Sequence, residues 1–230
     1  ATQRAISVGT TGGSVATAPN VSVTAGQSGC TIAVVTGSWL GDLIFTSGFL
    51  GTFAPAAATT ITGSLTATSG MTWTTGTGTI TFAATSTGKT ITSAGKSFYA
   101  VTFNGVGGGW TLQDAFTGTN AFTLTNGTFN TGNFAVTSAS YSLTGGTANM
   151  GSSIWTATGT GSVWTATSAT INASTSTIRL SDATTGALTF AGGSQTYNNL
   201  SLTGVAGTGT LTITGNNTFN TLSSSRTGIY

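Results

Sequence analysis

Apolar side chains recur in short alternating runs along this chain. Clear examples are Ile61 and Leu65, Ile80 and Phe82, Val101 and Phe103, Phe122 and Leu124, Leu200 and Leu202, and Leu211 and Ile213. Such alternation is typical of β-strands that bury one face. Clusters of Gly, Asn, Ser and Thr separate the runs, as expected of turns, and no segment has a helical period. The chain is therefore predicted to be all-β with very little helix.

A long-range repeat relates two parts of the chain. Positions 80–112 recur at 178–211 with an offset of about 98 residues, and each copy contains a tyrosine, an apolar strand and a Gly-Val step. A shorter echo places Trp155 and Trp164 nine residues apart, each followed by Thr-Ala-Thr. That spacing suits two neighbouring strands with one turn between them. Repetition of this kind indicates growth by stacking of similar units.

The predicted fold is a parallel β-solenoid, or β-helix, of irregular short strands. Frequent glycine suits tight corners, and recurring Thr-x-Thr runs can stack as ladders between coils. Strands at this spacing also describe a β-sandwich or jelly-roll array, which is the alternative. We expect an N-terminal β region over 1–55, either a cap or a different repeat type, and solenoid repeats over 56–230. The boundary is placed where Pro55 and a run of alanines interrupt the strand pattern.

Charged residues make up only 3% of the 230 residues, against about 25% in ordinary soluble domains. No apolar run approaches the ~18 residues of a membrane-spanning helix, and the abundance of β-branched and aromatic residues argues against disorder. The net charge of +2 comes from scattered groups, whereas phosphate binding needs clustered basic residues. Neither membrane insertion nor nucleic-acid binding is expected.

Cys30 is the only cysteine, so no internal disulfide can form, and we interpret it as a small buried hydrophobe. The first seven residues lack a charged end followed by an apolar stretch, so they do not resemble a signal peptide. The chain does not begin with Met. We therefore expect it to be a piece of a longer polypeptide.

Catalytic chemistry has few candidate groups. The chain has no His and no Glu, which removes the commonest general base and transition-metal ligand. Asp42, Asp114 and Asp182 remain, and paired carboxylates could serve glycoside hydrolysis, but capping of turns is the favoured interpretation for Asp114 and Asp182. Gly105–Gly109 lacks the Lys-Ser or Lys-Thr of a phosphate loop and is predicted to be a turn. No catalytic, cofactor-binding or metal-binding residue is assigned, and no enzyme is expected.

Bulky aromatic and threonine side chains raise two further interpretations. The five tryptophans could line a sugar-binding groove, but a chain rich in small residues needs them for its core or for a subunit interface. Trp155 and Trp164 are the candidate surface or interface aromatics. Thr-x-Thr runs suggest ice binding, which requires threonines in register, yet the runs recur at unequal intervals. Lys89 and Lys96 are interpreted as edge charges that discourage sheet pairing.

Several stretches resemble β-helical repeat proteins of tailed-bacteriophage virions, and similar repeats occur in bacterial surface proteins of the filamentous-adhesin type. The residues that carry the resemblance are 98–105, 110–114, 128–134 and 195–204. It covers the chain from about Gly70 to the end and is weak over 1–50. The resemblance implies a parallel β-helix in a virion appendage of the fibre or spike kind, or in an adhesin.

The expected function is that of a non-enzymatic structural protein at a virion surface, acting as a rigid spacer and as a contact to the host. A secreted bacterial adhesin or extracellular filament subunit is the alternative, and a polysaccharide-degrading tailspike or an ice-binding protein is less favoured. Sparse charge and exposed uncharged strands predict a homo-oligomer, either a trimer or a filament. Other virion or surface proteins and a host glycan are the remaining expected partners, with no cofactor.

Overall fold

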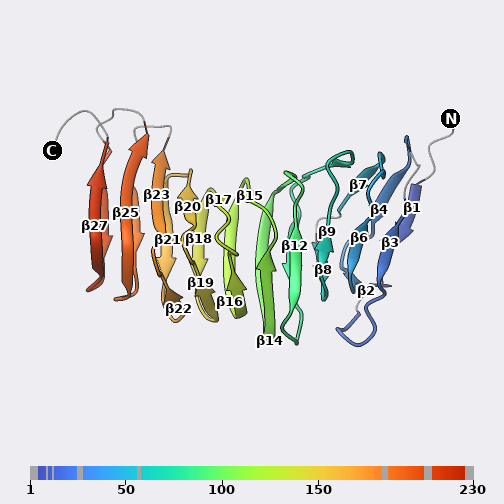
Figure 1. Cartoon of the computed structure of the whole chain (residues 1–230), viewed down its shortest axis with the longest axis horizontal. Helices are drawn as coiled ribbons and strands as arrows, with labels where there is room; N and C mark the ends of the chain where they lie inside the picture. Colours follow the sequence, from blue (N-terminus) through green and yellow to red (C-terminus); the bar gives the residue numbers. More distant parts are fainter. Residues whose placement is uncertain are drawn as a thin grey trace.

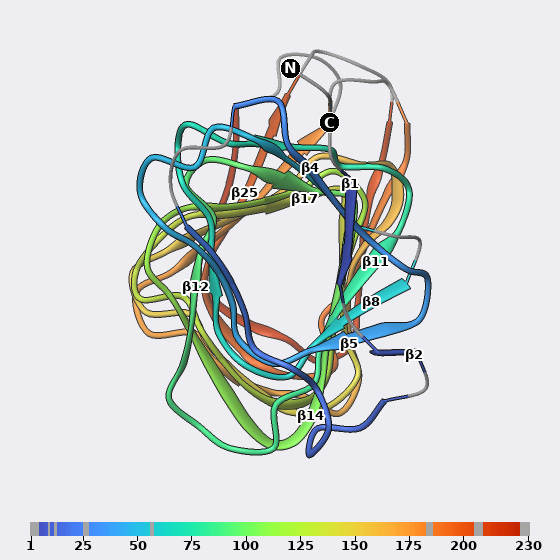
Figure 2. The same cartoon turned by 90° about the vertical axis from the view of Figure 1, so that its right-hand side faces the viewer.

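The computed structural model describes residues 5–8, 10–11, 13–24, 28–55, 58–182, 186–204 and 209–225. Over these residues the chain is all-β, without a helix, and its strands lie side by side along the long axis in about nine turns (Figure 1). Viewed along that axis, successive coils overlie one another around a shared interior (Figure 2). The predicted parallel β-solenoid is confirmed, and the sandwich alternative is wrong. No helix of the described residues is long and apolar enough to cross a membrane.

Each turn of the solenoid contributes strands to three faces in a fixed order. The first face contains β2 (Thr10–Thr11), β5 (Ser38–Leu40), β8 (Ala58–Ile61), β11 (Thr79–Phe82), the first half of β14 (Ala100–Leu112), the first half of β16 (Ala121–Asn130), β18 (Ser140–Leu143), β21 (Gly161–Ala166), β24 (Leu188–Ala191) and β26 (Leu211–Thr214). Strands β14 and β16 run on from the first face to the second.

The second face contains β3 (Val21–Val23), β6 (Leu43–Phe45), β9 (Leu65–Thr66), β12 (Lys89–Thr92), the later halves of β14 and β16, β19 (Thr147–Asn149) and β22 (Thr170–Asn172). The third face contains β1 (Ala5–Val8), β4 (Thr31–Val34), β7 (Thr52–Ala54), β10 (Thr72–Trp73), β13 (Ser97–Phe98), β15 (Phe116–Gly118), β17 (Val136–Ser138), β20 (Ile154–Ala157), β23 (Thr177–Asp182), β25 (Thr196–Gly204) and β27 (Thr218–Ser224). Strands β25 and β27 begin before the third face, at the position that β22 occupies in an earlier turn.

Neighbouring coils pair in parallel register although the number of residues per turn varies. Thr123 pairs with Ser142, a step of 19 residues, whereas Thr165 pairs with Ala191, a step of 26. The corners absorb the difference, so the ladders stay aligned. Strand β2 is the exception among the described pairings, because it runs antiparallel to β5 at the N-terminal end.

The ladders continue across residue 55, where a domain boundary was expected. Strand β5 pairs with β8 and β7 pairs with β10, so coils on both sides of Pro55 stack in one solenoid. The 98-residue echo does not map onto a single face. Ile80 lies on the first face and pairs with Val101, whereas Ile178 lies on the third face and pairs with Leu200. The repeat therefore matches pairs of strands one turn apart.

A continuous apolar core fills the interior, because alternate strand residues point inward at every turn. Its central feature is a column of stacked rings. The ring of Phe103, for example, lies 4.9 Å from Phe82, 4.7 Å from Phe129 and 5.2 Å from both Phe122 and Trp110, measured between centroids. Burial of these rings, together with the aliphatic side chains of the same core, stabilises the stack of coils.

Candidate functional site

The two candidate surface or interface aromatics, Trp155 and Trp164, lie in the core. Both are fully buried, and their ring centroids are 5.8 Å apart. The indole nitrogen of Trp155 donates to Ser153 Oγ at 2.9 Å, and that of Trp164 donates to Tyr197 Oη at 3.2 Å. The expectation that these rings reach a surface of the chain is corrected: they supply interior volume and are satisfied there. They come from consecutive strands, β20 and β21, as their nine-residue spacing predicted.

Two core tyrosines share this environment. Tyr141 Oη lies within hydrogen-bond distance of the backbone oxygens of Val136 (2.8 Å) and Thr156 (2.9 Å), which share its single O–H donor, and Tyr197 Oη donates to Gly192 O at 2.8 Å. Burial raises the pKa of Tyr141 well above its usual value and raises the pKa of Tyr197 to about 12. Both hydroxyls are therefore neutral and structural at physiological pH.

The carboxylates hold backbone turns across coils. Asp114 accepts from the backbone N–H groups of Ser93 (2.8 Å) and Ala94 (2.6 Å), and Ala94 has a φ of 50°, which is costly for a side chain other than glycine. The capping role predicted for Asp114 is thus confirmed, although the capped turn belongs to the preceding coil. Asp182 ends strand β23 instead of lying in a turn, because its backbone pairs with Gly204; its side chain lies outside the described residues.

Asp42 belongs to a stack of similar caps that the sequence analysis missed. Asn20 Oδ1 accepts from Asp42 N, Asp42 Oδ1 accepts from Ser64 N at 2.7 Å, and Ser64 Oγ accepts from Thr90 N at 3.1 Å. Steps of 22 to 26 residues separate these positions, and Asn20, Asp42 and Ser64 each precede an apolar residue. This spacing, with an apolar residue after each cap, is the sequence feature from which the stack of caps could have been predicted. Among the described residues, no group of His, Cys, Asp and Glu side chains could hold a metal ion.

Cys30, Lys96 and the glycine-rich segment 105–109 also occupy positions that are part of the solenoid's structure. Cys30 is buried, as predicted. Lys96 Nζ donates to Ser69 O at 2.9 Å, which anchors it to the preceding coil. The predicted turn at Gly105–Gly109 is wrong: this segment continues β14 through an irregular register. A Cβ atom at Gly105 or Gly108 would overlap the carbonyl oxygen of Ala84, so the glycines allow one coil to approach the next.

A row of hydroxyls runs along the first face in register. Thr60, Thr81, Thr102, Thr123, Ser142 and Thr165 pair successively from coil to coil. The unequal sequence intervals predicted that the threonines would not be in register. This prediction is wrong, because corners of different length separate strands that still pair in register. The next outward position on the same strands is alanine in β8, β14 and β16 (Ala58, Ala100 and Ala121). The face therefore carries one regular row of hydroxyls. A second row of outward side chains, two residues earlier on each strand, is interrupted by these alanines.

Thr-apolar-Asn triplets follow the second face toward the C-terminal end. They are Thr128–Asn130, Thr147–Asn149, Thr170–Asn172, Thr196–Asn198 and Thr218–Asn220. Their asparagines form amide pairs: Asn172 Nδ2 donates to Asn149 Oδ1 at 2.7 Å, and Asn220 Nδ2 donates to Asn198 Oδ1 at 3.3 Å. The repeated triplet was visible in the sequence, but its alignment depends on corner lengths that the sequence does not specify.

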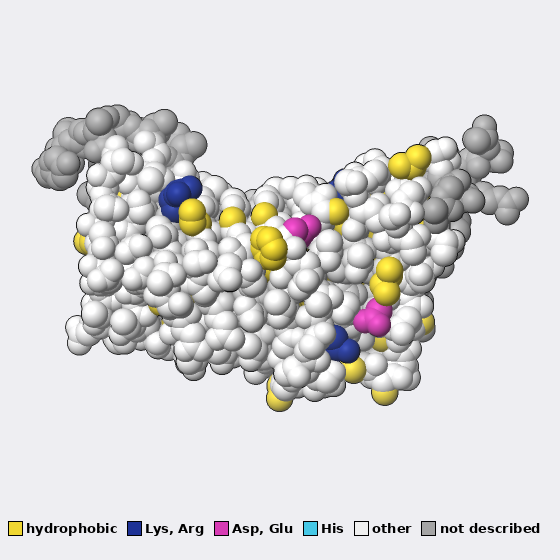
Figure 3. Space-filling model, viewed as in Figure 1, with side chains coloured by type: hydrophobic (Ala, Val, Ile, Leu, Met, Phe, Trp, Pro, Cys, Tyr) yellow, Lys and Arg dark blue, Asp and Glu magenta, His cyan; other side chains and the backbone are white. Residues whose placement is uncertain are grey.

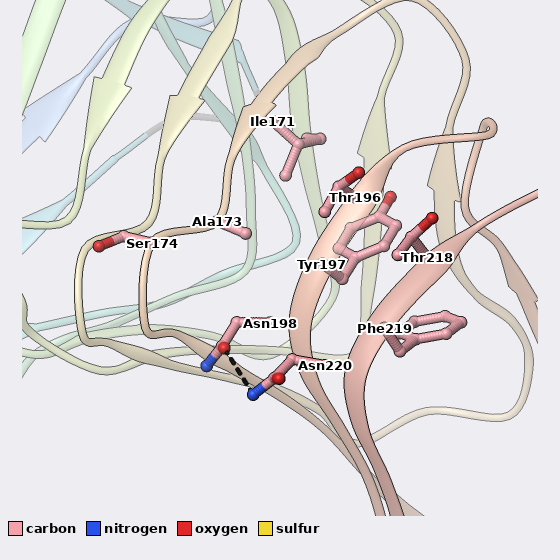
Figure 4. Close-up of a pocket in the computed structure, with 9 residues that line it drawn as sticks. All are labelled: Ile171, Ala173, Ser174, Thr196, Tyr197, Asn198, Thr218, Phe219 and Asn220. Atoms are coloured by element: carbon pink, nitrogen blue, oxygen red, sulfur yellow. Dashed lines mark hydrogen bonds between the residues drawn. The ribbon is translucent and has the colours of Figure 1, made fainter.

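A groove interrupts this row of triplets. It has a volume of about 670 Å³ and lies between Ile171, Ala173 and Ser174 on one coil and the triplets of β25 and β27 on the next two (Figure 4). Asn198 and Asn220 point toward each other at its edge (Figure 4).

Comparison with known protein families, curated proteins and solved structures gives no match to this chain. The groove, the hydroxyl row and the uncharged exterior are therefore interpreted from their own chemistry. One whole side of the molecule shows only a few scattered charges (Figure 3).

Proposed function

We propose that this chain is a rigid, non-enzymatic segment of an extracellular fibre, of the kind found in virion appendages. The observation that carries the proposal is the parallel ladder of the first face, which continues from β5 to β26 over one apolar core. Because each coil is bonded to both neighbours, bending would break backbone hydrogen bonds and ring contacts together. Such a segment holds two attached parts at a fixed separation.

The polar side chains also support a structural role. Asp42 and Asp114 accept backbone hydrogen bonds, and the hydroxyls of Tyr141 and Tyr197 donate to carbonyl oxygens in the core. These four side chains are thus occupied in holding the coils together. The few exterior charges reduce repulsion between chains that lie side by side, which favours assembly into a trimer or filament.

Labelling native particles tests the proposal. An antibody against the folded chain should decorate a thin appendage on phage particles in electron micrographs. Decoration of the bacterial envelope in the absence of phage would instead favour a secreted adhesin or filament subunit. Small-angle scattering of the purified chain should give a compact, rigid particle about 40 Å long, from nine coils at roughly 4.8 Å per coil. A flexible, extended particle would contradict the spacer role.

A further inference from the structure

The groove beside β25 and β27 arises where the solenoid loses a corner. In the preceding coil, a turn at positions 173–176 separates β22 from β23, and Ser174 in this turn has a φ of 50°. In the next two coils the chain runs straight through Asn198 and Asn220 within single strands. The turn therefore projects beyond the strands that follow it. Strand β25 pairs with β23 only from Asn199 onward, and β22 pairs with β19 alone, so no backbone ladder closes the opening in the described part of the chain.

The lining of the groove combines an apolar floor with a polar, uncharged rim. Ile171, Tyr197 and Phe219 line the floor. Ile171 and Tyr197 are buried, with 9% and 1% of their surface exposed, whereas Phe219 is only partly buried and stacks on the ring of Tyr197 at a centroid distance of 5.7 Å and an interplanar angle of 20°. The rim consists of Ser174, Thr196, Asn198, Thr218 and Asn220. None of the nine lining residues carries a charge. A neutral ligand therefore loses no favourable ion hydration on entry, whereas an anion or cation would find no counter-charge.

The amides at the rim retain hydrogen-bonding capacity. Asn198 Nδ2 donates to Ser176 O at 3.1 Å, and Asn220 Nδ2 donates to Asn198 Oδ1. Each primary amide has two N–H donors and an oxygen with two lone pairs. Among the described residues, these bonds leave one N–H on each amide and the oxygen of Asn220 available. Donor and acceptor side by side match a sugar hydroxyl, which can both accept and donate. The partly buried ring of Phe219 offers an apolar contact to the C–H groups of a pyranose ring.

An extended peptide fits the groove less well. Strand addition depends on several backbone hydrogen bonds along an open edge. Strand β22 has three residues, and Thr170 N and Asn172 O already bond toward the preceding coil. Because alternate residues of a strand bond in opposite directions, only Ile171 offers backbone groups to the groove. We propose that the groove is a binding site for neutral polysaccharide, which would provide the host contact in the fibre proposed above.

The test uses the full chain and three neutral polysaccharides, dextran, mannan and galactan, in affinity electrophoresis, with dextran sulfate as the charged comparison. At least one neutral polymer should retard the chain. Asn220→Ala should weaken that binding by about threefold to tenfold through loss of one or two hydrogen bonds. Asn216→Ala is the matched control, because Asn216 is exposed on the same turn of the chain and does not line the groove. Equal unfolding midpoints for both variants would establish that the loss is local.

Three results would overturn the proposal: no retardation by any neutral polymer, retardation by dextran sulfate alone, or equal effects of the two substitutions. Tight binding of a peptide containing Thr-Phe-Asn, with no neutral glycan bound, would also overturn it and identify a strand acceptor. This inference rests on the fibre proposal only for its biological setting. Scattering and particle labelling test the spacer role separately, so failure of one proposal is distinguishable from failure of the other.

Discussion

Replacement of Phe103 by alanine should be among the most destabilising single changes in the solenoid. The ring is fully buried and contacts four other rings in its own and neighbouring coils. Phe→Ala changes in cores cost about 3–5 kcal/mol, and aromatic pairs add about 0.5–1.5 kcal/mol each beyond buried area. We therefore expect a loss near the top of that range, about 4–5 kcal/mol, in the free energy of unfolding.

The matched control is Phe219→Ala, the same change in the last described coil. Phe219 is only partly buried, and its ring contacts Phe190 and Tyr197, both at 5.7 Å. Its removal should cost about 1–2 kcal/mol, since less apolar area leaves the interior. Urea denaturation followed by tryptophan fluorescence measures both variants. If Phe219→Ala were as costly as Phe103→Ala, the claim that stability depends on an interior column of rings would be refuted.

Further predictions concern the turn cap, alkaline pH and the hydroxyl row. Asp114→Ala should lower the free energy of unfolding by about 1–3 kcal/mol because two backbone donors lose their acceptor, and Asp114→Asn, which keeps one acceptor oxygen, should cost less in the same denaturation assay. Burial raises the pKa of Tyr197 to about 12, so the stability present below pH 10 should be lost as the pH rises through 12; in Tyr197→Phe the decline should be shallower, and an unchanged slope would exclude this residue as its source. Ice binding, and hence thermal hysteresis in a freezing assay, is not expected, because alanines interrupt the second row of outward side chains on the first face. Measurable hysteresis would contradict that reasoning.

The fold could be predicted because alternation and turn chemistry are local properties of the sequence. Ile80 and Phe82 alternate with threonines, and both are buried in β11. Register could not be predicted in the same way. The step from Thr123 to Ser142 is 19 residues and that from Thr165 to Ala191 is 26, and the sequence alone does not reveal which corner residues loop outward.

Less of the candidate site could be predicted from the sequence. The sequence predicts that bulky rings fill a core or an interface, but it does not specify that Trp155 and Trp164 point inward, where both are fully buried. The groove depends on a missing turn: Asn172 is followed by Ala-Ser-Thr-Ser before the next apolar strand, whereas Asn198 is followed almost directly by Leu200. This contrast indicates a groove only when the ladders show which triplets lie next to each other.

The variable corners also affect how such a chain can change over generations. Residues added or lost at a corner, as between the 19-residue and 26-residue steps, leave the strands before and after them in the same ladder. Insertions there can create ledges and grooves on the exterior while the stacked interior stays intact. Surface recognition in this architecture can therefore diversify by small insertions and deletions at corners, without rebuilding the scaffold.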